Sequence, residues 1–341
     1  MKTFKLTKET QRMKIGEYLK EIQNYSSRSM RQIKVYLNGK EVKLTKKLPS
    51  GGVLRVIEKE KGTNIEPIYV PLDIVYEDDD LLIINKQPFL LTHPTFKKAD
   101  FTLANGVVYY FKEKYGKEQV PRFYNRLDMN TSGLIIVTKT AFAQAYLQNH
   151  SQFEKKYLAI VDGNFDKEEI IVEKPIYRDG DNLERLIDER GQYSKTIFRK
   201  IKNYPEKNVS LIECELFTGR THQIRVHLKS EGHFIVGDDL YGDGNKIEGV
   251  ERQFLHAYKI KFTHPVSNEE ISLEIPIYED MKKYIEKELR STKHYKVDED
   301  NIEKGELYIL TDSDGSLLPR FDLWYNIPFS RTSRGKSYRF R

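Results

Sequence analysis

The chain has 341 residues, of which 38% are hydrophobic and 32% are charged. This balance indicates a folded core beneath a highly charged surface and excludes a chain that is disordered throughout. No apolar run approaches the roughly 20 residues that a membrane helix needs, and no apolar signal-peptide core follows the lysine-rich start. We therefore expect a cytoplasmic protein that does not associate with membranes. The single cysteine, Cys214, lies in a strand-like run, where a buried thiol is expected rather than a nucleophile.

Positive charge is concentrated at the two ends of the chain. Residues 1–60 hold 15 Lys or Arg against six Glu, and residues 319–341 hold six basic residues against one acidic residue. The residues between them are net acidic, because the formal charge of the whole chain is only +6. Clustered Lys and Arg neutralise phosphates and release counterions, so the N-terminal segment indicates a nucleic acid as partner.

The first 60 residues predict a small α/β module. Residues 12–35 are predicted to be helical, and the basic stretch 26–31 starts a second helix. A hairpin follows, in which Asn38-Gly39 forms the turn, and residues 53–57 alternate as a further strand. The apolar residues at helical spacing are Ile15, Tyr18, Leu19 and Ile22.

A Lys- and Glu-rich linker at residues 58–66 separates this module from a second one, in which short strands and helices follow each other irregularly. This order favours an α+β fold with a mixed, mainly antiparallel sheet and peripheral helices over a doubly wound parallel sheet. We expect the small module at residues 1–63, a catalytic domain at 68–290 and a charged, partly disordered extension at 291–341. The predicted strands include Leu81–Ile84, Leu134–Val137, Tyr157–Val161 and Val209–Leu216, and the predicted helices include Thr140–His150 and Asp280–Leu289.

The most informative segment is the polar loop of residues 125–133, which runs directly into the apolar strand 134–137. Ser132 and Gly133 allow a tight turn and the strand gives rigid support, so the carboxylate of Asp128 can be held towards a pocket. An aspartate in a loop is more often a turn-former or a cap, however. The loop alone therefore does not identify a catalytic site.

A second segment, residues 217–228, predicts a strand end, a glycine turn and a helix. Backbone N–H groups and the dipole at a helix N-terminus favour anions, so Arg220 beside it can keep an aspartate ionised or bind an RNA phosphate. The alternative is a capping loop with surface arginines. His222 and His227 are five residues apart and do not share a helix face, so we expect no metal site.

Together these segments resemble the RNA pseudouridine synthases of the RluA type. Residues 126–134 are similar to the family signature HRLDxxTSGL, and residues 219–227 resemble its second signature. The resemblance covers about residues 74–277, and the N-terminal module resembles the alpha-L RNA-binding module of ribosomal small-subunit proteins. Further matching blocks are Asn85-Lys86 with His93-Pro94, residues 155–163, residues 236–242, residues 255–257 and His264-Pro265.

The resemblance implies roles for individual residues. Asp128 matches the nucleophile, Tyr157 the aromatic residue that stacks on the target uracil, and Arg220 the basic partner of the aspartate. The implied substrate-binding residues are Arg126, which enters the gap left by the flipped base, Ile224, which lines the apolar side of the pocket, Arg225 and Asn125. Two departures occur: Asn125 stands where the family usually has His, and residues 87–89 replace a commoner Pro-x-Gly.

The implied activity is the isomerisation of specific uridines in structured RNA, in ribosomal RNA rather than transfer RNA. It needs a nucleophile but no redox or energy input, so we expect no cofactor, and we expect a monomer with RNA as its partner. A nucleoside or glycoside hydrolase is the enzyme alternative, since it also uses aspartate attack on an anomeric carbon. A catalytically silent RNA-binding or ribosome-assembly factor is the alternative from another class.

Overall fold

The computed structural model describes residues 2–286, except for residues 24, 26, 32, 59–61, 95–100, 151–152, 243 and 245–246. The expected C-terminal extension at 291–341 lies outside the described residues. No helix in the described part of the chain is both long enough and apolar enough to cross a membrane.

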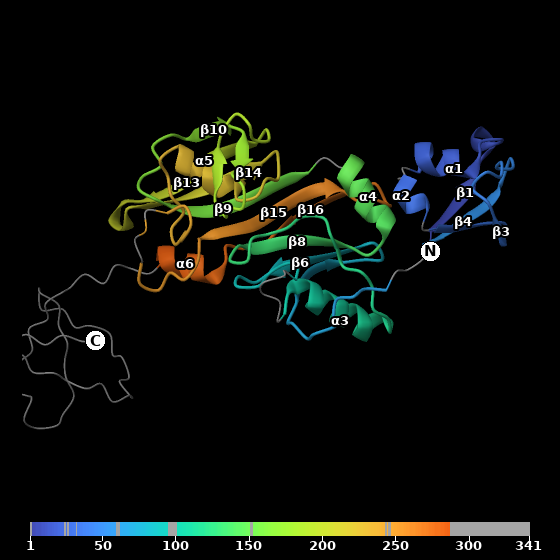
Figure 1. Ribbon diagram of the computed structural model, residues 1–341, viewed down its shortest axis with the longest axis horizontal. Coiled ribbons are helices and arrows are strands. Elements are labelled where there is room, and N and C mark those ends of the chain that lie inside the picture. The colour runs from blue at the N-terminus through green and yellow to red at the C-terminus, as the bar shows by residue number, and fades with distance from the viewer. Residues whose placement is uncertain are drawn as a thin grey trace, which may run out of the picture. The chain divides into compact units, whose positions relative to one another are not determined.

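The N-terminal residues form an antiparallel sheet with the strand order β1-β4-β2-β3 (Figure 1). Its strands are β1 (Lys2–Leu6), β2 (Ile33–Leu37), β3 (Lys40–Val42) and β4 (Gly52–Glu58), and its helical turns are η1 (Lys8–Thr10), α1 (Ile15–Glu17), η2 (Tyr18–Ile22) and α2 (Ser27–Met30). The predicted hairpin and two helical segments are confirmed. The helical prediction was wrong at residues 33–35, which begin β2, and it missed β1.

The larger sheet has ten strands and the order β10-β13-β14-β9-β15-β8-β6-β5, with β16 beside β15 and β7 beside β8. Among its described strand pairs, only β15 and β8 run parallel, so the predicted mixed, mainly antiparallel sheet is confirmed. The strands are β5 (Asp73–Glu77), β6 (Leu81–Lys86), β7 (Arg122–Phe123), β8 (Ser132–Thr138), β9 (Glu154–Asp162), β10 (Glu169–Glu173), β13 (Lys195–Tyr204), β14 (Val209–Leu216), β15 (Leu255–Thr263) and β16 (Glu270–Glu274). A separate hairpin consists of β11 (Ile176–Arg178) and β12 (Arg185–Ile187).

Helices cover both faces of the sheet around β6 and β8 (Figure 1). Residues of α3 (Leu103–Tyr115) pack on Ile135 and Val137 of β8, whereas α4 (Ala141–His150) packs on Leu134 and Ile136. Successive side chains of a strand point to opposite faces, so both sets are buried and the strand has no polar face. This explains why residues 134–137 of β8 are continuously apolar rather than alternating.

The remaining helices are η3 (Pro205–Lys207), α5 (Gln223–Ser230) and α6 (Glu279–Glu286). Ile224 and Leu228 of α5 pack on apolar residues of β9 and β14, and the predicted core position of Cys214 is confirmed, since its side chain is fully buried. The helix α4 also contacts the N-terminal module, because the rings of Phe142 and of Tyr25, which lies between η2 and α2, are 4.7 Å apart.

The side chain of Glu77 ties α3 to the sheet. Its carboxylate accepts hydrogen bonds from Tyr110, Lys114 and Tyr115 of α3 and from Lys139. Burial by itself would raise the pKa of Glu77, but these hydrogen bonds outweigh it and lower the pKa to about 2. The carboxylate therefore stays ionised at neutral pH and fixes the helix by charge-assisted hydrogen bonds.

Candidate active site

Asp128 lies on the loop that leads into β8, and side chains from three segments fix the backbone of this loop. The Asn125 amide donates to the Leu134 carbonyl at 3.1 Å and accepts the Ile136 N–H at 2.8 Å, so it fastens the start of the loop to β8. The Thr92 hydroxyl donates to the carbonyl of Leu127 at 3.1 Å. The backbone carbonyl of Leu127, the residue before Asp128, is therefore fixed.

Two buried cations fix the backbone after Asp128. Lys86 is fully buried at the end of β6, and its ammonium donates to the carbonyls of Gln87, Leu90 and Met129. Burial, together with the positive charge of Arg252, lowers the pKa of Lys86 to about 7, against the opposing effect of Asp128. No function was predicted for Lys86, although a lysine at the end of an apolar strand is a signal that the sequence contains.

Arg252 is the second buried cation, with 1% of its side chain exposed. Its Nη1 donates to the carbonyl of Asn130 at 3.1 Å, while Nε and Nη2 pair with Asp280 at 2.6 and 2.7 Å. Lys86 and Arg252 thus bind the backbone carbonyls of the two residues that follow Asp128, Met129 and Asn130.

Gly133 allows β8 and β15 to lie side by side at the base of the loop. It has φ +118°, and a Cβ at this position would lie 2.3 Å from the carbonyl oxygen of Ala257. Any other residue would force the two strands apart, because no side chain fits at that distance.

The carboxylate of Asp128 forms an ion pair with Arg225 of α5, whose Nη1 lies 3.3 Å from Oδ2. The same guanidinium binds Asp238 with two further hydrogen bonds, of 2.7 Å from Nε and 2.6 Å from Nη2. Asp238 is almost completely buried, whereas 22% of the Asp128 side chain is exposed. Arg225 therefore joins a buried carboxylate, which anchors it, to a carboxylate that a ligand can reach.

The expected pairing of Asp128 with Arg220 is wrong. Arg220 lies on the exposed turn before α5, and its Nε donates to the carbonyl of Tyr193 at 3.2 Å. Arg225 instead lies buried within α5, and its Nη1 reaches Oδ2 of Asp128. A signal was present in the sequence, since Arg225 is flanked by Ile224 and Val226, and an arginine in such an apolar setting needs a buried partner.

Tyr157 and Ile224 lie beside this ion pair in one buried cluster, which also contains Leu127. Tyr157 lies on β9 between Cys214 of β14 and Ala257 of β15, and only 8% of it is exposed. Burial and the nearby negative charge of Asp128 raise the pKa of Tyr157, so its hydroxyl remains protonated. The structure thus brings Asp128, Tyr157 and Ile224 together, with Arg225 as the basic partner.

His222 also faces Asp128, which the sequence analysis missed. It precedes α5 with φ +58°, its Nε2 lies 3.7 Å from Oδ2 of Asp128, and its Nδ1 lies 2.8 Å from the hydroxyl of Tyr241. In the described residues, no group of three or more His, Cys, Asp or Glu is arranged to hold a metal ion. His222 is therefore treated as a neighbour of the Asp128 carboxylate and not as a metal ligand.

Comparison with known proteins decides the family. Residues 80–230 match the family described as RNA pseudouridylate synthase. The chain is 39% identical over 232 residues to the "Uncharacterized RNA pseudouridine synthase YhcT" of Bacillus subtilis, an alignment that covers 66% of this chain and 75% of the relative. The chain belongs to the RNA pseudouridylate synthase family. It is accordingly a pseudouridine synthase, an isomerase, as the resemblance to the RluA type implied.

A second relative agrees with this family, and a solved structure agrees with the fold. The synthase is 38% identical over 234 residues to the "Ribosomal large subunit pseudouridine synthase D" of Zymomonas mobilis, covering 64% of this chain and 73% of the relative. A solved structure, "Human RNA Pseudouridylate Synthase Domain Containing 4", superposes with a TM-score of 0.50 at 21% identity, covering 60% of this chain and 88% of that one. This structure supports the fold alone.

The two other residues expected to bind substrate, Asn125 and Arg126, are neighbours on the loop before Asp128. Arg126 is exposed and makes no hydrogen bond or ion pair with another described residue, and its charge, after burial, helps to lower the pKa of His93. The amide of Asn125 forms two hydrogen bonds with the backbone of β8 and so positions the loop of the synthase. A contact of Asn125 with substrate stays a prediction.

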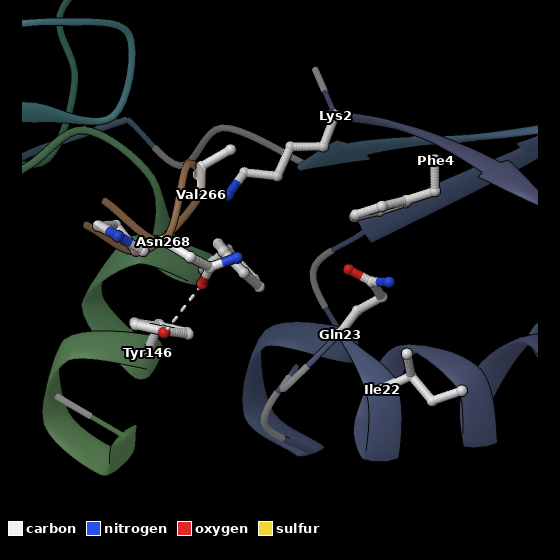
Figure 2. A pocket seen from close by; sticks show the side chains of 9 residues that line it. Lys2, Phe4, Ile22, Gln23, Tyr146, Val266 and Asn268 are labelled. Atoms are coloured by element: carbon white, nitrogen blue, oxygen red, sulfur yellow. Dashed lines mark hydrogen bonds between the residues drawn. The ribbon is translucent and has the colours of Figure 1, made fainter. Parts of the chain in front are cut away.

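A pocket of about 160 Å³ lies between the N-terminal sheet and α4, apart from the residues around Asp128 (Figure 2). Lys2 bridges this junction, with its ammonium 3.2 Å from the ring centre of Phe142 and 3.4 Å from Asp80. The pocket is lined by Lys2, Phe4, Ile22, Gln23, Phe142, Tyr146, Pro265, Val266 and Asn268. None of the residues that hold Asp128 contributes to this pocket.

Proposed function

We propose that this synthase isomerises specific uridines in structured RNA, in ribosomal RNA rather than transfer RNA, with Asp128 as the nucleophile. The observation that carries the proposal is the Asp128 carboxylate, which is partly exposed on a fixed loop and paired with Arg225 at 3.3 Å. The name of the Zymomonas mobilis relative, a ribosomal large subunit pseudouridine synthase, supports ribosomal RNA as the substrate class.

The reaction breaks the bond between the ribose and a ring nitrogen, turns the uracil, and joins the same ribose carbon to a ring carbon. That ring carbon loses a proton and the ring nitrogen gains one, so the RNA keeps its mass. A carboxylate can hold one fragment covalently while the base turns. Arg225 favours the charged form of Asp128, because an opposite charge at this distance stabilises the carboxylate.

The target uridine must leave its helix, at a cost of a few kcal/mol, because a stacked base cannot reach a recessed carboxylate. Stacking on an aromatic side chain offsets about 1–3 kcal/mol of that cost. Tyr157 supplies the aromatic surface and Ile224 an apolar wall in this proposal, and the exposed Arg126 fills the gap that the base leaves. Each of these side chains lies within or next to the cluster around Asp128.

The N-terminal module, proposed at residues 1–63, holds the surrounding RNA. Lys43, Lys46 and Lys47 are exposed on the segment between β3 and β4. Lysines of this kind bind phosphates without recognising the base sequence, so the uracil would be recognised by the residues around Asp128.

The hydrolase alternative needs a second carboxylate that is free to act on a proton or on water. Asp238 is the second carboxylate beside Asp128, but it is bound by Arg225 and by the N–H groups of Leu240 and Tyr241. Its side chain is 1% exposed, so it cannot take up that role.

The test is to incubate the purified protein with ribosomal RNA and with transfer RNA, and to map pseudouridine in each. We expect isomerisation of ribosomal RNA without any change in RNA mass and without release of uracil. Asp128→Asn, which keeps the size of the side chain, should form no pseudouridine. Free uracil in the reaction, or full activity of Asp128→Asn, would refute the proposal.

A further inference from the structure

His222 has an uncommon backbone conformation for a residue with a side chain. Its φ of +58° lies in the left-handed region, which non-glycine residues adopt rarely and mostly at functional positions. Although it occupies the N-cap of α5, its side chain makes no capping hydrogen bond. The ring instead packs edge-on against Tyr241, with the ring centres 5.5 Å apart. Its orientation is therefore set by Tyr241 and not by the helix.

The hydrogen bonds of Tyr241 determine which ring nitrogen of His222 carries the proton. The Tyr241 oxygen accepts the backbone N–H of Arg185 in β12 at 2.8 Å and lies 2.8 Å from Nδ1 of His222. Burial raises the pKa of Tyr241 to about 12, so the phenol keeps its single proton, which it donates to Nδ1. Burial also lowers the pKa of His222, so the ring is neutral at pH 7 and its proton is on Nε2.

The opposite assignment is unfavourable for a second reason. It would place the proton on Nδ1 and turn the lone pair of Nε2 towards the carboxylate of Asp128, 3.7 Å away. Two electron-rich groups would then face each other at a partly buried site, where electrostatic repulsion is stronger than in water.

Both basic neighbours of Asp128 lie on the same oxygen. Arg225 Nη1 is 3.3 Å and His222 Nε2 is 3.7 Å from Oδ2, whereas no described residue donates a hydrogen bond to Oδ1. We propose that His222 is a positioning residue that, oriented by Tyr241, directs Nε2–H at Oδ2 of Asp128 and so leaves Oδ1 as the attacking oxygen. This inference rests on the proposed function of Asp128 as the nucleophile.

The distance of 3.7 Å is longer than a hydrogen bond, so in the free protein His222 acts on the carboxylate through its dipole. When Oδ1 forms its bond to the substrate carbon, whether of the ribose or of the ring, the bond from that carbon to its leaving atom breaks or its π-bond shifts. Oδ2 then becomes the carbonyl oxygen of the ester. Arg225 and the Nε2–H of His222 hold this oxygen while the base turns.

Protonation of His222 should oppose the attack, because an imidazolium binds the carboxylate more tightly and withdraws charge from it. The charged and titratable groups that face the ring are Asp128, Arg225, Arg185, Asp238 and Tyr241. Since burial lowers the pKa of His222 from its usual 6.5, the ring is neutral at pH 7, and the titration of His222 should not affect the rate there. The rate should fall at more acidic pH as the ring takes up a proton.

The test uses two variants that spare the backbone. Asn tolerates the left-handed region and is favoured at an N-cap, so His222→Asn removes the ring without straining the turn. Tyr241→Phe removes only the hydroxyl and keeps the ring that stacks on Arg225 at 4.8 Å. Tyr193→Phe is the matched control, since it removes an exposed hydroxyl that bonds Glu173.

Single-turnover release of tritium from RNA labelled at the uracil carbon that loses its hydrogen measures the reaction itself. We expect Tyr241→Phe and His222→Asn each to slow it by about tenfold or more, the effect of one hydrogen bond at the reacting group, with the Kd for RNA within about threefold of wild type. The double variant should be no slower than His222→Asn, because both changes break one chain of contacts. His222→Asn should also lose the acid limb of the rate profile. Tyr193→Phe should match the wild type.

A second measurement does not depend on RNA. In protein labelled with ¹⁵N-histidine, the signal that disappears in His222→Asn should show an unprotonated Nδ1 and a protonated Nε2 at pH 7. A protonated Nδ1 would overturn the inference. A wild-type rate and an unchanged acid limb in His222→Asn would also overturn it, and the proposed function would still stand if Asp128→Asn is inactive. Absence of tritium release from every RNA by the wild type would overturn the proposed function instead.

Discussion

Substitution of Asp238 by Asn should disable the synthase although Asp238 does not face the substrate. Asp238 accepts two charge-assisted hydrogen bonds from Arg225, at 2.6 and 2.7 Å, and its Oδ1 also accepts the N–H groups of Leu240 and Tyr241 at 3.0 Å. An asparagine can keep its oxygen at the Oδ1 position. Its NH₂ group then faces Nε of Arg225, so one strong hydrogen bond is replaced by two opposed donors.

Removing one partner of a buried ion pair costs about 3–5 kcal/mol, because the other charge stays buried without compensation. Asparagine retains one acceptor, so we expect the lower end, about 3 kcal/mol of unfolding free energy. For a domain of this size, that loss lowers the Tm by roughly 6–12 °C. Arg225 should also lose its fixed position beside Asp128, so the rate of pseudouridine formation should fall by about tenfold or more.

Thermal unfolding and single-turnover kinetics below the new Tm measure the two effects. Asp188→Asn is the control, because Asp188 binds Arg190 through the same two-bond geometry on the surface, where 67% of the arginine side chain is exposed. Solvent screens such a pair, so the control should barely change either quantity. If Asp238→Asn shifted the Tm by no more than this control, Asp238 would not be the anchor of Arg225.

Three other predictions follow from contacts described above. Asp128→Ala should abolish isomerisation while the Kd for RNA stays within about threefold of wild type, since phosphate contacts dominate binding. Filter binding measures the Kd and pseudouridine mapping measures the activity, and residual activity would contradict the prediction. Changing Lys43, Lys46 and Lys47 to Gln should lower the slope of log Kd against log salt by about 2, whereas an unchanged slope would remove these lysines from the RNA interface. The folded-state pKa of Glu77, about 2, is depressed, so its contribution to stability is complete above about pH 4.5 and is lost as the pH falls towards 2. The wild type should therefore be more stable than Glu77→Gln by about 1–3 kcal/mol at pH 7 and should lose that advantage in acid, as urea unfolding at several pH values would show.

The sequence predicted those elements whose pattern is set by burial. The strands β8 and β14 and the helix α4 are apolar in ways that only a buried position explains, and each was placed within two residues. The strand β1 was missed because its sequence, KTFKL, has two lysines and only two buried or half-buried apolar residues. Its place is fixed by pairing with β4, which lies about 50 residues away.

The site could be predicted only in part, for a geometric reason. Arg220 and Arg225 lie five residues apart, and both fit the idea of a cation beside Asp128. Arg220 lies exposed on the turn before α5, whereas Arg225 is buried within the helix. Charge does not distinguish the two residues, and the apolar neighbours of Arg225 indicated that it is buried but not which carboxylate it binds. Asp238 and Tyr241 belong to the matching block 236–242, but the sequence assigned them no role, and their contacts with Arg225 and His222 are visible only in the folded chain.

Thr92, Lys86 and Arg252 hold the backbone of residues 127–130 by hydrogen bonds, and this affects whether the protein or the RNA changes conformation on binding. A loop that is already held at consecutive carbonyls loses little further conformational entropy when a ligand arrives. Most of the conformational change on binding must then occur in the RNA. The RNA has to unstack, rotate a nucleotide out of its helix and change its backbone conformation, while the loop of the protein stays fixed. The choice of uridine would in that case depend on how easily each stretch of RNA deforms, as well as on its sequence.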